Sequence, residues 1–127
     1  MRIAIDTNRY VDFAKGLPEA VKRFRRADEI LVPFVVLGEL RAGFTGGART
    51  ADNEANLVRF LDSRRVDMVF ADEGTTHHYA RLFQQLRRQG TPIPTNDLWI
   101  AALVTQHGLH LFARDAHFDH LPQIPRL

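Results

Sequence analysis

Near its start the sequence reads Ile3-Ala4-Ile5-Asp6-Thr7-Asn8, three apolar residues followed by a carboxylate and two polar residues. The apolar residues predict a short buried strand, and Thr7–Ala14 reads as a helix. A strand that leads directly into a helix is typical of a parallel sheet covered by helices. Ligands of such sheets bind beyond the carboxyl ends of the strands, which is where we expect Asp6 to lie.

The same alternation continues along the chain. Further strands are predicted at residues 30–32, 66–70 and 109–113, and an edge strand around Ile124. Further helices are predicted over residues 19–26, 34–44, 50–63, 75–88 and 98–106. The helix over 75–88 carries Tyr79, Leu82, Phe83 and Leu86 at the spacing of one apolar face. We therefore predict an α/β fold, with a parallel sheet and helices on both of its faces.

Length and composition narrow the class of protein. The chain has 127 residues, which predicts a single domain over residues 1–127, and its 45% hydrophobic content favours a packed core. The absence of cysteine excludes disulfides and thiolate metal sites. No apolar run is long enough to span a bilayer, and no signal-peptide pattern is visible, so we expect a cytoplasmic protein.

Four carboxylates fall where a single site could form: Asp6, Glu39, Asp97 and Asp115. Asp6 and Asp115 follow predicted strands, Asp97 opens a predicted helix, and Glu39 lies within an apolar one. Like charges converge in a folded protein only when a cation compensates them. Mg2+ and Mn2+ prefer oxygen ligands, so these residues predict a site for a hard divalent metal.

Each acid also has an ordinary explanation when taken alone. Asp6 could cap the following helix, Asp97 could complement a helix dipole, and Asp115 could be a turn residue. Glu39 could be an exposed helical residue. Asp119 is an alternative carboxylate for the position of Asp115. Together the four acids support the metal-site prediction more strongly than any one of them does, because all fit the same edge of one sheet.

Three polar neighbours are expected to support the site. Thr7 and Asn8 could cap the first helix or assist the site through water. Asn96 is expected to cap the helix over 98–106, which would leave Asp97 free to point elsewhere.

The charge distribution suits a phosphate-rich partner. The net charge is only +2, but once the four acids are set aside the 17 Lys and Arg face 11 remaining acids of the total of 15. Lys occurs only at Lys15 and Lys22, and arginine has the planar fork that binds phosphate. Arg9, Arg41 and Arg114 are candidate phosphate contacts. The alternative is that arginine serves here as a general surface cation.

Other phosphate and hydrolase chemistries lack their motifs. There is no P-loop, no Gly-x-Ser-x-Gly elbow and no zincin spacing among the six histidines. A phosphoacceptor receiver domain needs a late lysine, and none occurs after Lys22. Haloacid-dehalogenase-type phosphatases need a second Asp where this chain has Asn8.

Four segments together resemble the PIN domain, specifically the toxin ribonucleases of VapBC toxin–antitoxin pairs. They are Ile3–Asn8, Val36–Leu40, Asn96–Ala102 and Arg114–Phe118. The order and spacing of the family's four acids fall here on Asp6, Glu39, Asp97 and Asp115. One departure is Ala113, where many relatives have Thr or Ser; this leaves a second metal site in doubt.

The resemblance implies a three-layer α/β/α sandwich and Mg2+- or Mn2+-dependent endonucleolytic cleavage of RNA, with 5′-phosphate and 3′-hydroxyl products. It also implies a homodimer and a cognate VapB-type antitoxin that blocks the site. We hypothesise that Asp6, Asp97 and Asp115 hold one ion, with Glu39 binding a second ion or positioning water. A catalytically silent PIN-like module that binds RNA or protein is the alternative.

An apolar segment is a further expectation for the antitoxin. Leu37, Leu40 and Phe44, with the Gly46-Gly47 loop, could line a groove for it. The alternative is that the three apolar residues are ordinary core.

Overall fold

A four-stranded parallel sheet forms the centre of the protein. The computed structural model describes residues 1–127, and the sheet has the order β3-β2-β1-β4. The strands are β1 (Arg2–Ile5), β2 (Glu29–Pro33), β3 (Val66–Val69) and β4 (His110–Phe112). The predicted α/β class with a parallel sheet is confirmed.

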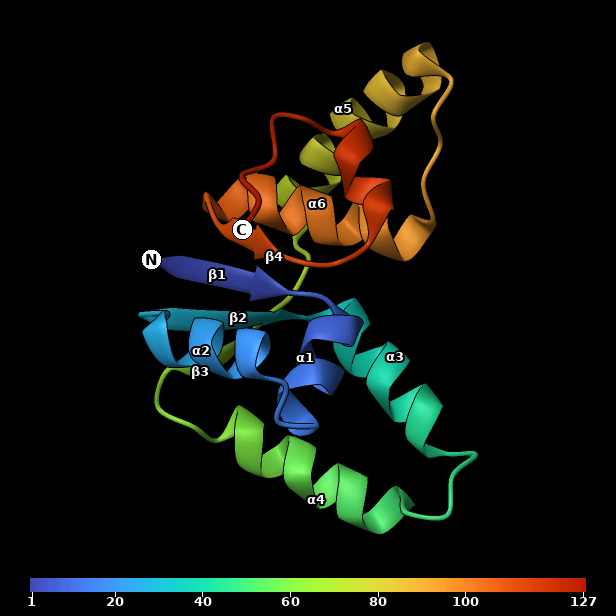
Figure 1. Ribbon diagram of the computed structural model, residues 1–127. Coiled ribbons are helices and arrows are strands. Elements are labelled where there is room, and N and C mark those ends of the chain that lie inside the picture. The colour runs from blue at the N-terminus through green and yellow to red at the C-terminus, as the bar shows by residue number, and fades with distance from the viewer.

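Six α-helices flank this sheet. Figure 1 shows α5 and α6 gathered at one end of the molecule and α1, α2 and α4 at the other. No helix is long and apolar enough to cross a membrane. The helices are α1 (Thr7–Ala14), α2 (Pro18–Arg26), α3 (Phe34–Phe44), α4 (Thr50–Leu61), α5 (Glu73–Gln89) and α6 (Thr95–His107).

The strand order creates a crevice at one edge of the sheet. The chain moves outward from β1 to β2 and β3, and then returns to the other side of β1 to form β4. Where the order reverses, the connections after the two strands lead away from each other and leave room for a ligand. Ile5 pairs with Phe112, so β1 and β4 end side by side. Asp6 and Asp115 follow these two ends.

Helix α6 is packed into the core almost all round. Ile100, Ala101, Ala102, Leu103 and Val104 are each at most 1% exposed. Two of these five are alanines, and small side chains let neighbouring elements approach closely. Because α6 is held on several sides, its first turn, which carries Asp97, is fixed relative to the sheet.

The starts of α5 and α6 differ from their predictions by more than one residue. Helix α6 begins at Thr95, with Pro94 at the cap position and no side-chain cap. Asn96 is therefore the second helical residue, and the prediction that it caps the helix is wrong. Helix α5 begins at Glu73 rather than Thr75, because Asp72 and Thr75 form a reciprocal capping box.

The position of Phe83 and the structure of the tail also differ from the sequence predictions. Phe83 was expected on the inward face of α5 but is 47% exposed, while Leu82 and Leu86 are buried. The tail forms a short 3-10 helix, η1 (Ala116–His120), and beyond it a single parallel bridge joins Arg126 to Leu111 instead of a full edge strand.

Candidate metal site

Asp6 lies at the junction of β1 and α1, and the residue is only 5% exposed. Its Oδ1 accepts a hydrogen bond from the backbone N–H of Arg9 at 2.9 Å, so Asp6 is the cap of α1. Capping uses one carboxylate oxygen and does not occupy the other. The alternative prediction, that Asp6 caps the following helix, is thus correct, and the free oxygen leaves a metal-binding role available.

Asp97 and Asp115 meet at His117. The Nδ1 atom of His117 lies 2.8 Å from Oδ2 of Asp97 and 2.9 Å from Oδ1 of Asp115. Donor atoms of these three residues all lie within 4.8 Å of one another, and all three are partly buried. Two acids distant in sequence have therefore been brought together, as predicted from their positions after β4 and at the start of α6.

Glu39 borders the site from α3. It is exposed, and its Oε1 accepts a hydrogen bond from Oγ1 of Thr7 at 3.0 Å. The expectation of an apolar setting for Glu39 is wrong, because the helix presents this residue to its open side. Glu39 still lies near enough to Asp97 for its charge to raise the pKa of that acid. Neither Glu39 nor Asp6 belongs to the tight group around His117.

Two of the acids at the site have pKa values above the ordinary value of an aspartate. Burial raises the pKa of Asp6, although the backbone N–H groups of Arg9 and Arg114 oppose this. Burial also raises the pKa of Asp97, where a hydrogen bond from His117 opposes it and the charge of Asp115 adds to it. The bond to Asp97 raises the pKa of His117. A divalent ion at this point would relieve the repulsion, and the donor set fits one.

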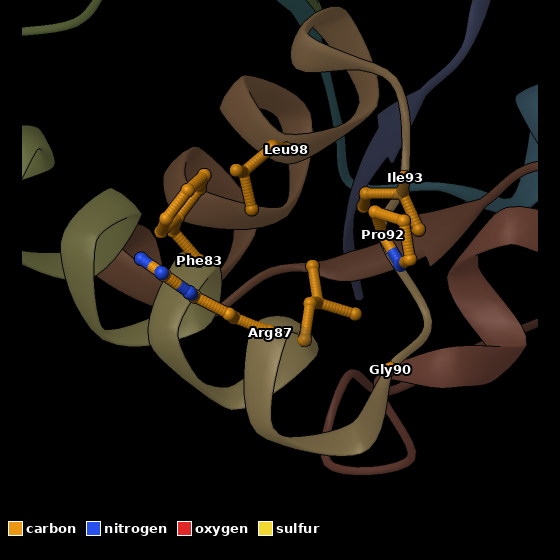
Figure 2. A pocket seen from close by; sticks show the side chains of 7 residues that line it. Phe83, Arg87, Gly90, Pro92, Ile93 and Leu98 are labelled. Atoms are coloured by element: carbon orange, nitrogen blue, oxygen red, sulfur yellow. The ribbon is translucent and has the colours of Figure 1, made fainter.

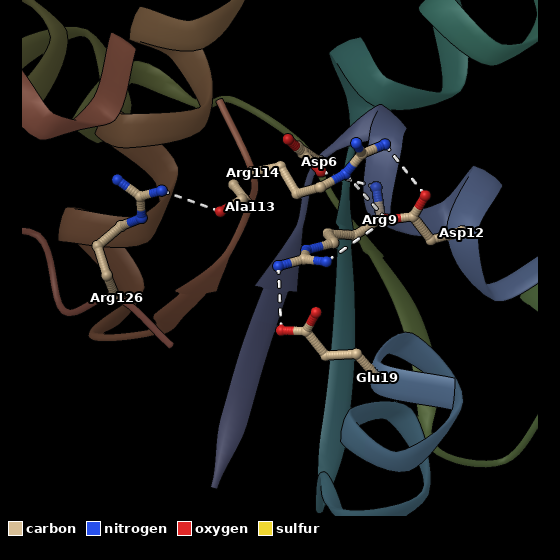
Figure 3. Close-up of polar contacts among 7 residues, drawn as sticks. All are labelled: Asp6, Arg9, Asp12, Glu19, Ala113, Arg114 and Arg126. Atoms are coloured by element: carbon tan, nitrogen blue, oxygen red, sulfur yellow. Dashed lines mark hydrogen bonds and ion pairs between the residues drawn. The ribbon is translucent and has the colours of Figure 1, made fainter. Parts of the chain in front are cut away.

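Arg9 is part of a buried network beside the site. Figure 3 shows its guanidinium among Asp12, Glu19 and Arg114. It pairs with Asp12 at 3.4 Å and lies 4.1 Å over the ring of Phe112. Since its side chain is only 10% exposed, Arg9 has little access to an incoming phosphate. The network holds α1 against the end of β4.

Arg114 and Arg41 are more accessible, but each already has a partner. Arg114 reaches from the end of β4 to Asp12, with Nε 2.9 Å from Oδ2 (Figure 3). Arg41 pairs with Glu54 at 2.8 Å. A phosphate would therefore have to compete with a carboxylate for either side chain.

The remaining predicted residues surround the site loosely. Thr7 contacts Glu39, whereas Asn8 and Asn96 are exposed. Asp119 is exposed and pairs with Arg126 at 2.9 Å, away from the group around His117. The structure thus brings Asp115, and not the alternative Asp119, to Asp97.

His117 is the residue that the sequence reasoning missed. The six histidines were judged by zincin spacing, which tests only whether histidines lie one helical turn apart. The available signal was His117's position two residues after Asp115 in a segment already singled out. Its partner Asp97 is 20 residues away in sequence, so no local pattern could show the contact.

The apolar segment of α3 is mostly core. Leu37 and Leu40 are buried, and only Phe44 faces outward enough to line a hollow of about 490 Å³ between α1 and α4. A second hollow, of about 350 Å³, opens between the end of α5 and the start of α6 (Figure 2). Its lining includes Phe83, Ile93 and Arg87 and contains no acid, so it is separate from the metal site.

Comparison with known proteins identifies the family. The profile of the PIN domain matches residues 3–124. The chain belongs to the PIN domain family. This PIN domain is 30% identical over 113 residues to "Ribonuclease VapC1" of Haemophilus influenzae strain R2866, which covers 86% of the chain and 80% of the relative.

Solved structures agree with this assignment. The PIN domain resembles a DNA-bound VapBC from Salmonella typhimurium with a TM-score of 0.88 and 22% identity, covering 100% of this chain and 97% of the other. It resembles VapBC-5 from Mycobacterium tuberculosis with a TM-score of 0.76 and 28% identity, covering 99% and 98%. The predicted three-layer α/β/α fold and the family are confirmed.

Proposed function

We propose that this PIN domain is a metal-dependent endoribonuclease and the toxin component of a type II toxin–antitoxin pair. The observation that carries the proposal is the meeting of Asp97 and Asp115 at the carboxyl edge of the sheet, with Asp6 and Glu39 beside them. The similarity to proteins named Ribonuclease VapC supports RNA as the substrate.

Each acid has a proposed role. Asp97 and Asp115 would hold a Mg2+ or Mn2+ ion, with Asp6 contributing directly or through water. Glu39, which is exposed and held by Thr7, would position water or bind a second ion. The bound metal supplies an activated water and neutralises charge on the phosphoryl oxygens. Arg114 is the best-placed of the three proposed phosphate contacts, because it is half exposed and adjoins Asp6.

The partners follow from the relatives. The solved structures that resemble this chain include VapBC complexes, so we propose a VapB-type antitoxin as its partner. The hollow lined by Phe44, Tyr10 and Asn56 offers it a surface on α1 and α4. We also propose a homodimer and a cytoplasmic location.

RNA cleavage by purified protein tests the function. Wild type should cut RNA with Mg2+ or Mn2+ and not with a chelator. Asp97→Asn should lose cleavage, while Asp119→Asn, an acid near the site but outside it, should retain it. Mapping RNA ends in cells that express wild type and Asp97→Asn would then name the target.

Two results would reject this proposal. Full activity of the Asp97→Asn variant would remove the acidic site from catalysis. A folded wild type that binds RNA or antitoxin but cuts nothing with any divalent metal would favour the catalytically silent module.

A further inference from the structure

The group around His117 has an unusual composition for a site expected to use oxygen ligands alone. His117 is its only nitrogen donor, and that nitrogen approaches a carboxylate oxygen of Asp97 at 2.8 Å and one of Asp115 at 2.9 Å. The ring nitrogen therefore lies between the two carboxylates, within 3 Å of both.

These distances match the geometry of a metal's coordination shell. Adjacent ligands of octahedral Mg2+, with bonds of about 2.0–2.1 Å, lie about 2.8–3.0 Å apart, because the edge of an octahedron is √2 times the bond length, and the larger Mn2+ ion spaces them slightly more widely. The two distances to Nδ1 fall in this range. In this structure the contact with Asp97 is a hydrogen bond, and an ion bound at the same place would replace the proton on Nδ1.

The fold holds the ring in this position. Asp115 caps η1 by accepting a hydrogen bond from the backbone N–H of His117 at 2.9 Å. The next residue, Phe118, is 1% exposed and anchors the turn in the core. The ring itself stays half exposed, so it is open to an ion arriving from solvent. A backbone fixed on both sides reduces the cost of ordering the ligand.

We propose that His117 Nδ1 is a third protein ligand of the metal, together with Asp97 and Asp115, and that it makes the site prefer Mn2+ over Mg2+. The inference rests on the metal site of the proposed function and adds the ligand that sets its selectivity. Mg2+ binds almost exclusively oxygen, whereas first-row transition metals gain from an imidazole nitrogen. One nitrogen ligand among oxygen ligands therefore raises the affinity for Mn2+ relative to that for Mg2+.

A spectroscopic measurement tests the bond directly. Electron spin echo modulation of the Mn2+-loaded protein reports hyperfine coupling to a directly bound imidazole nitrogen. Wild type should show this coupling, and His117→Gln should lose it. His120→Gln should keep it, since His120 is an exposed histidine three residues away in the same turn.

Metal affinity supplies the second readout. Titration calorimetry with Mn2+ and with Mg2+ should show that His117→Gln lowers the ratio of Mn2+ to Mg2+ affinity by about tenfold, through loss of the nitrogen ligand. His120→Gln should leave the ratio unchanged. Circular dichroism and thermal unfolding of both variants check that the fold is retained.

Three outcomes would overturn the proposal. Wild type that shows no nitrogen coupling, or that binds no Mn2+, excludes the ligand role. Equal weakening of both metals in His117→Gln would mean that the ring only orients the two carboxylates. Failure of the proposed function is a separate result, because a protein could show nitrogen coupling and yet cut no RNA.

Discussion

At the scale of the single residue, Asp6 combines a structural role with a proposed chemical one. Its Oδ1 caps α1 through the N–H of Arg9, while burial raises its pKa. The cap needs only an acceptor oxygen, whereas metal binding needs a negative charge. Substitutions that keep one property and remove the other can therefore separate the two roles.

We predict that Asp6→Asn folds with nearly wild-type stability and has no metal-dependent RNA cleavage. The amide oxygen still accepts from Arg9, but the charge is gone. Asp6→Ala should lose cleavage and also about 1 kcal/mol of the free energy of unfolding, because the cap is lost as well. Urea denaturation and a cleavage assay measure the two effects; an active Asp6→Asn would remove Asp6 from the mechanism.

At the scale of the element, α5 depends on a single carboxylate at its start. Asp72 accepts hydrogen bonds from the N–H of Thr75 at 3.1 Å and from Nε2 of Gln106 at 2.9 Å. The bond from Gln106 is the main reason that the pKa of Asp72 lies below its ordinary value of 3.8. Because Gln106 belongs to α6, the same carboxylate joins two packed helices.

The lowered pKa predicts a pH dependence of stability. The ionised form of Asp72 is favoured by folding, so its contribution is present above pH 3.8 and is lost as the pH falls toward the lower pKa of the folded state. Asp72→Asn keeps an acceptor but cannot titrate. Thermal unfolding of the two proteins should show wild type more stable near neutral pH, with the difference shrinking in acid; a constant difference would contradict this.

The packing of α6 leads to a second prediction at this scale. Ala102 is fully buried, so there is no room for a larger side chain without displacing its neighbours. Ala102→Leu should cost about 1–3 kcal/mol of the free energy of unfolding through overpacking. Thr105→Leu, on the exposed side of the same helix, should change it by less than about 0.5 kcal/mol. Chemical denaturation measures both, and equal costs would show that burial is not the cause.

At the scale of the whole molecule, four exposed arginines outside the acidic site have no carboxylate partner. Arg25 and Arg26 of α2 and Arg87 and Arg88 of α5 are exposed and form no ion pair. Arginines without a carboxylate partner are free to bind phosphates along an RNA strand. Electrostatic attraction of this kind weakens with salt, because binding releases counterions from the nucleic acid.

We predict a salt-dependent affinity of the Asp97→Asn variant for single-stranded RNA. Each phosphate contact contributes a slope of about −0.7 to the plot of log affinity against log salt concentration. Changing Arg87 and Arg88 to Gln in that background should reduce the slope by about 1.4 if both contact phosphate. Fluorescence anisotropy measures the slope, and an unchanged slope would place the RNA elsewhere on the surface.

Local patterns in the sequence were sufficient for most of the architecture. Buried strands separated by helices predicted the parallel sheet, and Asp6, Asp97 and Asp115 were recognisable as a set because ends of parallel strands share one edge. The start of α6 was missed, because the helix begins at Thr95 after Pro94, without the side-chain cap that Asn96 was expected to provide. Phe83 was misplaced because helical spacing identifies the apolar face of α5 but does not show that this part of the face borders an open hollow.

The sequence by itself predicted most of the elements, the family and the candidate acids, because hydrophobic periodicity and residue order act over short stretches of chain. Only the tertiary structure decided that β4 lies beside β1, that the ion pair of Arg9 and Asp12 is buried, and that His117 joins Asp97 and Asp115. These contacts depend on which distant segments pack together. That packing is set by the contacts of the entire core, so it cannot be read from any one segment of the sequence.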